Sequence, residues 1–252
     1  SNGQFAVGFS DPAQSKDAEV VINGGKIKAG WYTIAGNGQT TEADGNITVN
    51  GGILESTADY AIYHPQAGTT TINGGVISGE AGGVCINRGT LKVTGGTVTS
   101  SGLGNTGNWG DGTGGVGKAA IYVNAEYGDT KAMITGGTIT ANNDAVIVAT
   151  NNATNKAIIA ISGGSFNKEV SADYCATGYA PVKNTDDTYG VAAKDSLETS
   201  TSVSGSTSTA TIGGKYSGKE DNNVTTVGDT VTINVKNNES ANVTTSEITV
   251  DK

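Results

Sequence analysis

The chain has 252 residues, of which 39 are glycine and 3 are proline, and only 15% are charged. This composition is typical of a turn-rich β protein, because long helices need runs of Ala, Leu, Glu and Lys. The net charge of −9 and the single arginine, Arg88, exclude the clustered basic side chains that bind a nucleic-acid backbone. No apolar run approaches the roughly 20 residues of a membrane span, so we expect no membrane insertion.

From about Ala18 onward a repeat is visible, in which a Gly-Gly pair follows a short alternating segment. The six copies are VVINGGKIK, ITVNGGILE, TTINGGVIS, LKVTGGTVT, AMITGGTIT and AISGGSFN, and their first glycines are Gly24, Gly51, Gly74, Gly95, Gly136 and Gly163. The spacing of 21 to 41 residues is about that of one coil in a three-sided parallel β-helix, with insertions placed in loops.

Two apolar columns support this interpretation. The first, two residues before each pair, holds Ile22, Val49, Ile72, Val93, Ile134 and Ile161. The second, three residues after the first glycine, holds Ile27, Leu54, Ile77, Val98, Ile139 and Phe166. Because side chains alternate faces along a strand, each column can point into one core shared by stacked coils.

A polar column precedes the glycines and holds Asn23, Asn50, Asn73, Thr94, Thr135 and Ser162. Stacked amides can hydrogen-bond from coil to coil, so we predict an asparagine ladder at a corner, continued by hydroxyls. The Gly-Gly pair permits the positive φ that a sharp corner needs.

A further strand follows in each coil, in the segments WYTIAG, YAIYHP, GVCINR, AAIYVN and DAVIVA. We therefore predict an all-β fold, a parallel β-helix of about six to seven coils over residues 1–192. The 41-residue interval contains the glycine-rich segment Ser100–Gly117, which we interpret as a long loop rather than as an additional coil.

The segment ISGGSFNKEVSADYCATGYAPVKNTDDTYGV, Ile161–Val191, resembles one that is common in large surface proteins of Gram-positive gut bacteria. The coils before it resemble pectate-lyase-like right-handed parallel β-helix modules. The resemblance implies a secreted or cell-surface location beside other domains of the same larger protein, and it implies no catalytic residue. Independently, the aromatic residues Phe166, Tyr174, Tyr179 and Tyr189 are suited to cap the open end of the core.

The composition changes after residue 192. Residues 193–210 are rich in Ser and Thr and suggest a linker. Residues 211–252 contain short alternating segments, which predict a small or truncated β module.

One candidate ligand-binding patch holds Tyr63, His64, Asn87 and Arg88. The single histidine and the single arginine follow the same strand in adjacent coils, so the repeat places them about one coil apart. The alternative is that these are ordinary polar residues at strand ends.

A second candidate lies in the glycine-rich loop, at Asn108, Trp109 and Asp111. We expect an indole in a polar loop to pack against the protein or to bind a ligand, because exposing it to solvent is costly. It can stack on a sugar with Asn and Asp holding hydroxyls, or it can fold back on the solenoid. Further stacking surface is available from Tyr32, Tyr60, Tyr63, Tyr122 and Tyr127.

Other chemistry has little support in the sequence. Two carboxylates at a defined separation would be needed for glycoside hydrolysis, but Glu42, Asp44, Glu55 and Asp59 are mostly in predicted turns. Cys85 and Cys175 lie several coils apart, so we expect two buried free thiols rather than a disulfide. We expect no cofactor and no metal.

These observations favour a non-enzymatic secreted or cell-surface module that acts in adhesion or glycan binding, with a glycan or host surface as partner. One alternative is a carbohydrate-active enzyme of the β-helix class, either a polysaccharide lyase or a glycoside hydrolase. Another alternative is a structural stalk with no ligand.

Overall fold

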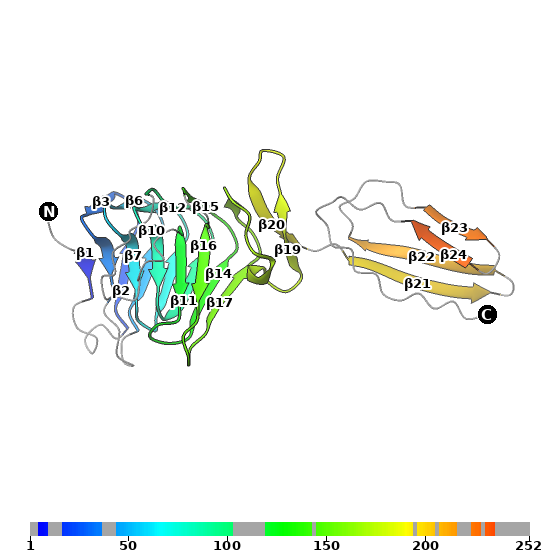
Figure 1. The fold of residues 1–252 in the computed structure, drawn as a ribbon, viewed down its shortest axis with the longest axis horizontal. Coiled ribbons are helices and arrows are strands. Elements are labelled where there is room, and N and C mark those ends of the chain that lie inside the picture. Colours follow the sequence, from blue (N-terminus) through cyan, green and yellow to red (C-terminus); the bar gives the residue numbers. More distant parts are fainter. Residues whose placement is uncertain are drawn as a thin grey trace. The chain divides into compact units, whose positions relative to one another are not determined.

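The computed structural model describes residues 5–9, 17–36, 44–102, 119–142 and 145–193 with their side chains. It describes the backbone of residues 196–204, 207–215, 223–227 and 230–234. The chain divides into two units, Ser1–Ala192 and Ala193–Lys252 (Figure 1).

The first unit is a parallel β-helix with three sides (Figure 1). Each side is one sheet, and the chain visits sheets B, C and A in turn before it begins the next coil. Consecutive strands therefore lie in different sheets, while neighbours within a sheet come from successive coils. Two of the sheets have six strands, one from each level of the stack, and the third has the same six together with two further strands at its C-terminal end, β19 (Tyr179–Lys183) and β20 (Tyr189–Ala193).

Sheet A contains β1 (Phe5–Gly8), β4 (Tyr32–Ala35), β7 (Tyr60–His64), β10 (Gly82–Ile86), β13 (Ile121–Asn124) and β16 (Ile147–Thr150). Sheet B contains β2 (Glu19–Ile22), β5 (Asn46–Val49), β8 (Thr69–Ile72), β11 (Gly89–Val93), β14 (Thr130–Ile134) and β17 (Ala157–Ile161). Sheet C contains β3 (Lys26–Ala29), β6 (Ile53–Ser56), β9 (Val76–Gly79), β12 (Thr97–Ser100), β15 (Thr138–Ala141), β18 (Ser165–Phe166), β20 (Tyr189–Ala193) and β19 (Tyr179–Lys183).

Both predicted apolar columns are confirmed. The column from Ile22 to Ile161 runs in register through all six strands of sheet B. The column from Ile27 to Phe166 does the same through sheet C. All twelve side chains belong to, or pack against, one core cluster. Burial of these stacked aliphatic side chains is the main force that holds each coil on the next.

The corner between sheets B and C has the predicted backbone. The second glycine of every pair has a positive φ; these residues are Gly25, Gly52, Gly75, Gly96, Gly137 and Gly164. From Gly52 onward this second glycine lies against the main chain of the preceding coil. A Cβ on Gly52 would come within 2.7 Å of the Gly25 carbonyl oxygen. Glycine is required at this position both by conformation and by space.

The asparagine ladder is also present, and it lies on the exposed outside of this corner. The Asn50 Nδ2 donates to Asn23 Oδ1 over 2.8 Å, and the Asn73 Nδ2 donates to Asn50 Oδ1 over 2.9 Å. The Thr94 hydroxyl continues the series by donating to Asn73 Oδ1 over 2.9 Å. The Thr135 hydroxyl instead donates to a main-chain carbonyl, that of Val93, so the side-chain ladder ends at Thr94.

The long interval between the fourth and fifth coils holds no additional coil. Strands β10 and β13, β11 and β14, and β12 and β15 pair directly and in register. The prediction that this interval adds no coil to the stack is therefore confirmed. Residues 103–118, which were interpreted as part of a long loop, lie outside the described residues.

The C-terminal end of the core is covered by the aromatic cap that the sequence suggested. Phe166 is fully buried, and Tyr174, Tyr179 and Tyr189 pack against the core. Strand β20 pairs antiparallel with β18, so the parallel stack ends there. A short 3-10 helix, Ala172–Tyr174, lies between β18 and β19.

The described residues of the second unit form two antiparallel hairpins. Strand β21 (Ser196–Ser204) pairs with β22 (Thr207–Lys215), and β23 (Asn223–Val227) pairs with β24 (Thr230–Asn234). Strand β21 falls within the range that its Ser and Thr content suggested as a linker. Threonine and valine favour extended backbone, and pairing with β22 makes this segment part of a hairpin.

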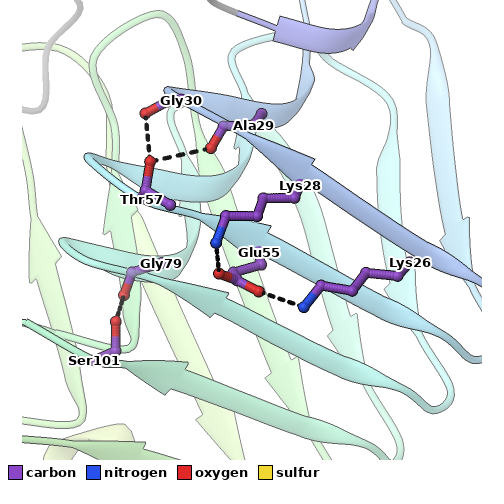
Figure 2. A network of polar contacts seen from close by, with 8 residues as sticks. All are labelled: Lys26, Lys28, Ala29, Gly30, Glu55, Thr57, Gly79 and Ser101. Carbon is purple, nitrogen blue, oxygen red and sulfur yellow. Dashed lines mark hydrogen bonds and ion pairs between the residues drawn. The ribbon is translucent and has the colours of Figure 1, made fainter. Parts of the chain in front are cut away.

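An ion-pair network on the outer face of sheet C joins the first two coils (Figure 2). Glu55 on β6 accepts from Lys26 over 2.8 Å and from Lys28 over 2.5 Å, both on β3. At the next corner, the hydroxyls of Thr57 and Ser101 donate to carbonyl oxygens of the preceding coil, including that of Gly79. Polar side chains outside the core thus also connect successive coils.

The hydrogen bonds from Lys26 and Lys28 lower the pKa of Glu55 from 4.5 to about 2. We expect the double variant Lys26→Gln/Lys28→Gln to return this pKa toward 4.5, as measured by carboxyl chemical shifts in an NMR titration. Because the pKa of Glu55 is lower in the folded chain than in the unfolded chain, its ionised form stabilises the fold. This contribution is fully present above pH 4.5 and is lost as the pH falls through about 2. An unchanged titration in the double variant would show that the lysines do not set this pKa.

Candidate binding surface

Aromatic side chains gather along sheet A in a second cluster, separate from the main core. Its buried members are Tyr32, Ala35, Tyr60, Tyr63, Ala81, Cys85 and Tyr122, with Trp31 and Val148 packed against them. In β7, Ile62 belongs to the main core and the next residue, Tyr63, belongs to the aromatic cluster. This is the alternation expected of a strand with a separate apolar layer on each face.

At the N-terminal end of sheet A, four rings stack nearly parallel across three successive strands. The centroids of Phe5 and Tyr32 lie 5.8 Å apart, and those of Tyr32 and Tyr63 lie 5.0 Å apart. The Trp31 indole lies 5.4 Å from the Tyr32 ring and 6.3 Å from the Phe5 ring, with interplanar angles of 7°. We call Phe5, Trp31, Tyr32 and Tyr63 the aromatic stack.

A buried carboxylate orients this stack. Asp59 is 1% exposed, and its Oδ2 accepts from the Trp31 Nε1 over 2.9 Å and from the Tyr32 hydroxyl over 3.5 Å. Its Oδ1 accepts from the main-chain N–H of Tyr60 over 2.8 Å. The Ser56 hydroxyl adds a further restraint, because it donates to the Trp31 carbonyl and accepts from the Asp59 N–H. Burying a carboxylate is costly unless donors surround it, as they do here.

The accessible part of the stack is at its N-terminal end. Phe5 is 46% exposed and Trp31 is half-buried, whereas Tyr32 and Tyr63 are buried. The exposed rings are therefore held in place by buried rings and by the carboxylate of Asp59. Such a rigid aromatic surface loses little conformational entropy when it contacts a ligand.

His64, a predicted ligand-binding residue, lies inside the solenoid and is fully buried. Its Nε2 donates to the Gly68 carbonyl over 3.2 Å, and its Nδ1 accepts from the Thr70 hydroxyl over 2.8 Å. Desolvation by burial lowers the pKa of His64 to about 4, although hydrogen bonds to main-chain carbonyls oppose this shift. One ring nitrogen bonds to Gly68 in the turn that leads to β8, and the other bonds to Thr70 in β8 itself. This histidine therefore joins β7 to the following turn and strand, and because its ring is fully buried it has no access to a ligand.

The other members of the predicted polar patch are only partly brought together. Asn87 is buried, and its Nδ2 donates to the Tyr63 hydroxyl over 3.4 Å. His64 pairs in register with Ile86, so Arg88 lies in the adjacent coil but two residues beyond the level of His64. The half-buried Arg88 side chain crosses Gly128, where a Cβ would come within 2.9 Å of Arg88 Cγ. The patch expected at one surface is divided because Tyr63 and His64 point to opposite faces of β7.

The second predicted site, at Asn108, Trp109 and Asp111, lies outside the described residues. Of the additional tyrosines, Tyr32, Tyr60, Tyr63 and Tyr122 all belong to the aromatic cluster, while Tyr127 does not.

The carboxylates considered for hydrolysis have separate structural roles. Asp44 accepts from the Asp17 N–H, Glu55 pairs with two lysines, and Asp59 orients the aromatic stack. Glu42 is not among the described residues. Both cysteines are free, as predicted, but only Cys85 is buried, because Cys175 lies in the partly exposed cap.

Within the part of the chain that the structure describes, no group of three or more His, Cys, Asp or Glu side chains could hold a metal ion. The same residues include no helix that is long and apolar enough to cross a membrane.

The sequence identified the tyrosines but missed Phe5, Trp31 and Asp59 as parts of the same surface. A usable signal was present, since Trp31-Tyr32 and Asp59-Tyr60 occupy equivalent positions at the start of β4 and β7. The pairing of a surface indole with a buried carboxylate in the next coil requires the three-dimensional stack.

The comparisons with known proteins add no relative: no family model, no curated protein and no solved structure matches this chain.

Proposed function

We propose that the β-helix is a non-enzymatic binding module of a secreted or cell-surface protein, and that its ligand is a glycan. The observation that carries this proposal is the aromatic stack, in which Asp59 and two buried tyrosines hold Trp31 and Phe5 at an accessible edge. A fixed indole presents a flat apolar face that suits the C–H-rich face of a sugar ring. A surface tryptophan with no ligand would gain little from a buried carboxylate that orients it.

The residues proposed for catalysis by a β-helix lyase or hydrolase have other roles in this chain. His64 is enclosed, with both nitrogens bonded. Asp44, Glu55 and Asp59 make structural contacts. These contacts favour adhesion or glycan binding over bond cleavage.

The proposal is tested on a glycan array with the wild-type chain and the Trp31→Ala variant. We expect Trp31→Ala to weaken binding by about tenfold or more, because truncating a central aromatic anchor removes much of the contact energy. Trp109→Ala serves as the matched variant, since it removes the other tryptophan of the chain. A thermal melt of each variant shows that the fold is retained.

The possible outcomes separate the three functions. Loss of binding in Trp109→Ala alone would move the site to the glycine-rich loop. Absence of binding by the wild-type chain to any glycan would favour a stalk. Release of products from pectin, alginate or mucin glycans by the wild-type chain would overturn the non-enzymatic proposal.

A further inference from the structure

Three rungs of the asparagine ladder are Asn-Gly dipeptides: Asn23-Gly24, Asn50-Gly51 and Asn73-Gly74. All three asparagine side chains are exposed. In an Asn-Gly sequence the glycine main-chain nitrogen can attack the side-chain carbonyl carbon of asparagine, since no Cβ on the glycine obstructs the approach. The ladder is thus built from side chains that are intrinsically prone to spontaneous deamidation.

The three rungs differ in how strongly the stack restrains this reaction. Asn73 makes two ladder hydrogen bonds, and the attacking nitrogen, that of Gly74, donates to the Val49 carbonyl over 3.3 Å. Asn50 also makes two ladder bonds, but among the described residues the Gly51 N–H has no acceptor.

Asn23 is the least restrained rung. Its only ladder bond is the one that its Oδ1 accepts from Asn50. Within the described ranges, the Gly24 N–H has no acceptor, and the ideal Cβ positions of Gly24 and Gly25 have no neighbouring atom within 4 Å. In later coils the corresponding positions lie against the carbonyls of the previous coil, as for Gly74 at 2.5 Å from Asn50 O.

We propose that Asn23 is a site of spontaneous deamidation, and that stacking protects Asn50 and Asn73 in increasing order. The Gly24 nitrogen forms a bond to Asn23 Cγ, the bond from Cγ to Nδ2 breaks, and ammonia leaves. Water then opens the cyclic imide at either carbonyl, which yields aspartate or isoaspartate at position 23. This inference is independent of the proposed glycan binding.

The two products have different effects on the first corner. An aspartate at position 23 still accepts from the Asn50 Nδ2, now through a charged oxygen, so the ladder persists. An isoaspartate inserts an additional carbon into the main chain between β2 and β3. It therefore shifts these two strands relative to each other and weakens their register with β5 and β6.

The test is incubation of the folded chain at mildly alkaline pH, followed by peptide mapping with tandem mass spectrometry. The peptides that carry Asn2-Gly3 and Asn37-Gly38, outside the described residues, are scored separately. We expect deamidation at Asn23 to be about fivefold faster than at Asn50, since one additional hydrogen bond must break at Asn50, and Asn73 to be slowest. The same chain unfolded in urea should show similar rates at all three sites.

Two variants make the expectation sharper. Gly24→Ala should slow deamidation at Asn23 several-fold without unfolding the chain, because position 24 has space for a Cβ. Asn50→Ala should accelerate deamidation at Asn23, because it removes the only hydrogen bond that this side chain makes to another described residue. Equal rates at the three sites in the folded chain, or Asn73 reacting before Asn23, would overturn the proposal.

Discussion

Lowering the pH from 7 to 4 should reduce the free energy of unfolding by about 3 kcal/mol through His64 alone. The imidazole is fully buried, and desolvation lowers its pKa from 6.5 to about 4. In the folded state the neutral ring donates from Nε2 to Gly68 and accepts at Nδ1 from Thr70. Protonation would place an uncompensated charge inside the solenoid.

The direction follows from the two pKa values. Between pH 6.5 and 4 the unfolded chain binds a proton at His64 that the folded chain does not bind. The contribution of His64 to the free energy of unfolding is therefore fully present above about pH 6.5. It falls as the pH falls through this window, and it levels off below about pH 4.

The measurement is urea unfolding at several pH values, followed by tryptophan fluorescence, since Trp31 and Trp109 both belong to the first unit. His64→Gln is the matched control, because an amide keeps a donor and an acceptor but does not titrate. We expect the pH dependence of this variant to be smaller by about 3 kcal/mol. Parallel pH profiles for both chains would contradict the assignment.

Gly75→Ala should destabilise the solenoid by about 2–4 kcal/mol. At this corner φ is +84°, a conformation that disfavours any residue with a Cβ. In addition, the new Cβ would lie 2.8 Å from the Gly52 carbonyl oxygen of the preceding coil. Relieving that contact requires the two coils to move apart at this corner.

The first coil supplies controls that separate the two causes. Gly25 has nearly the same φ, +82°, but no atom within 4 Å of its ideal Cβ, so Gly25→Ala should cost only the conformational strain of about 1–2 kcal/mol. Gly24 has neither feature, so Gly24→Ala should change stability by less than about 0.5 kcal/mol. Urea unfolding of the three variants measures this series. Equal effects of Gly25→Ala and Gly75→Ala would show that contact between coils contributes nothing at this corner.

The sequence predicted the stacked core because its signal repeats in every coil. A column such as Ile22 to Ile161 is a property of the repeat, and register places every member at the same level of the sheet. The corner glycines and the first three asparagines follow from the same periodicity. The aromatic cap was also predictable, since a solenoid must cover the end of its core.

The candidate surface was less predictable because it depends on side-chain direction at non-repeating positions. His64 and Tyr63 are adjacent in sequence yet serve opposite faces of β7, and the face of each follows only from the register that pairs His64 with the core residue Ile86. The Trp31–Asp59 hydrogen bond joins two coils at positions where the other coils carry small or polar residues. Cys175 was expected to be buried like Cys85, but it belongs to the cap, where the chain no longer follows the coil repeat that places alternate side chains in the core.

The direct pairing of β12 with β15 has a consequence for how this protein can change over evolutionary time. Each coil contacts only its neighbours, and the insertion between β12 and β13 leaves the register of all three sheets unaltered. In general, doubling the length of a connection between two elements costs only about 0.6 kcal/mol of loop-closure free energy. This junction can therefore accept inserted sequence while the stack of coils around it stays the same.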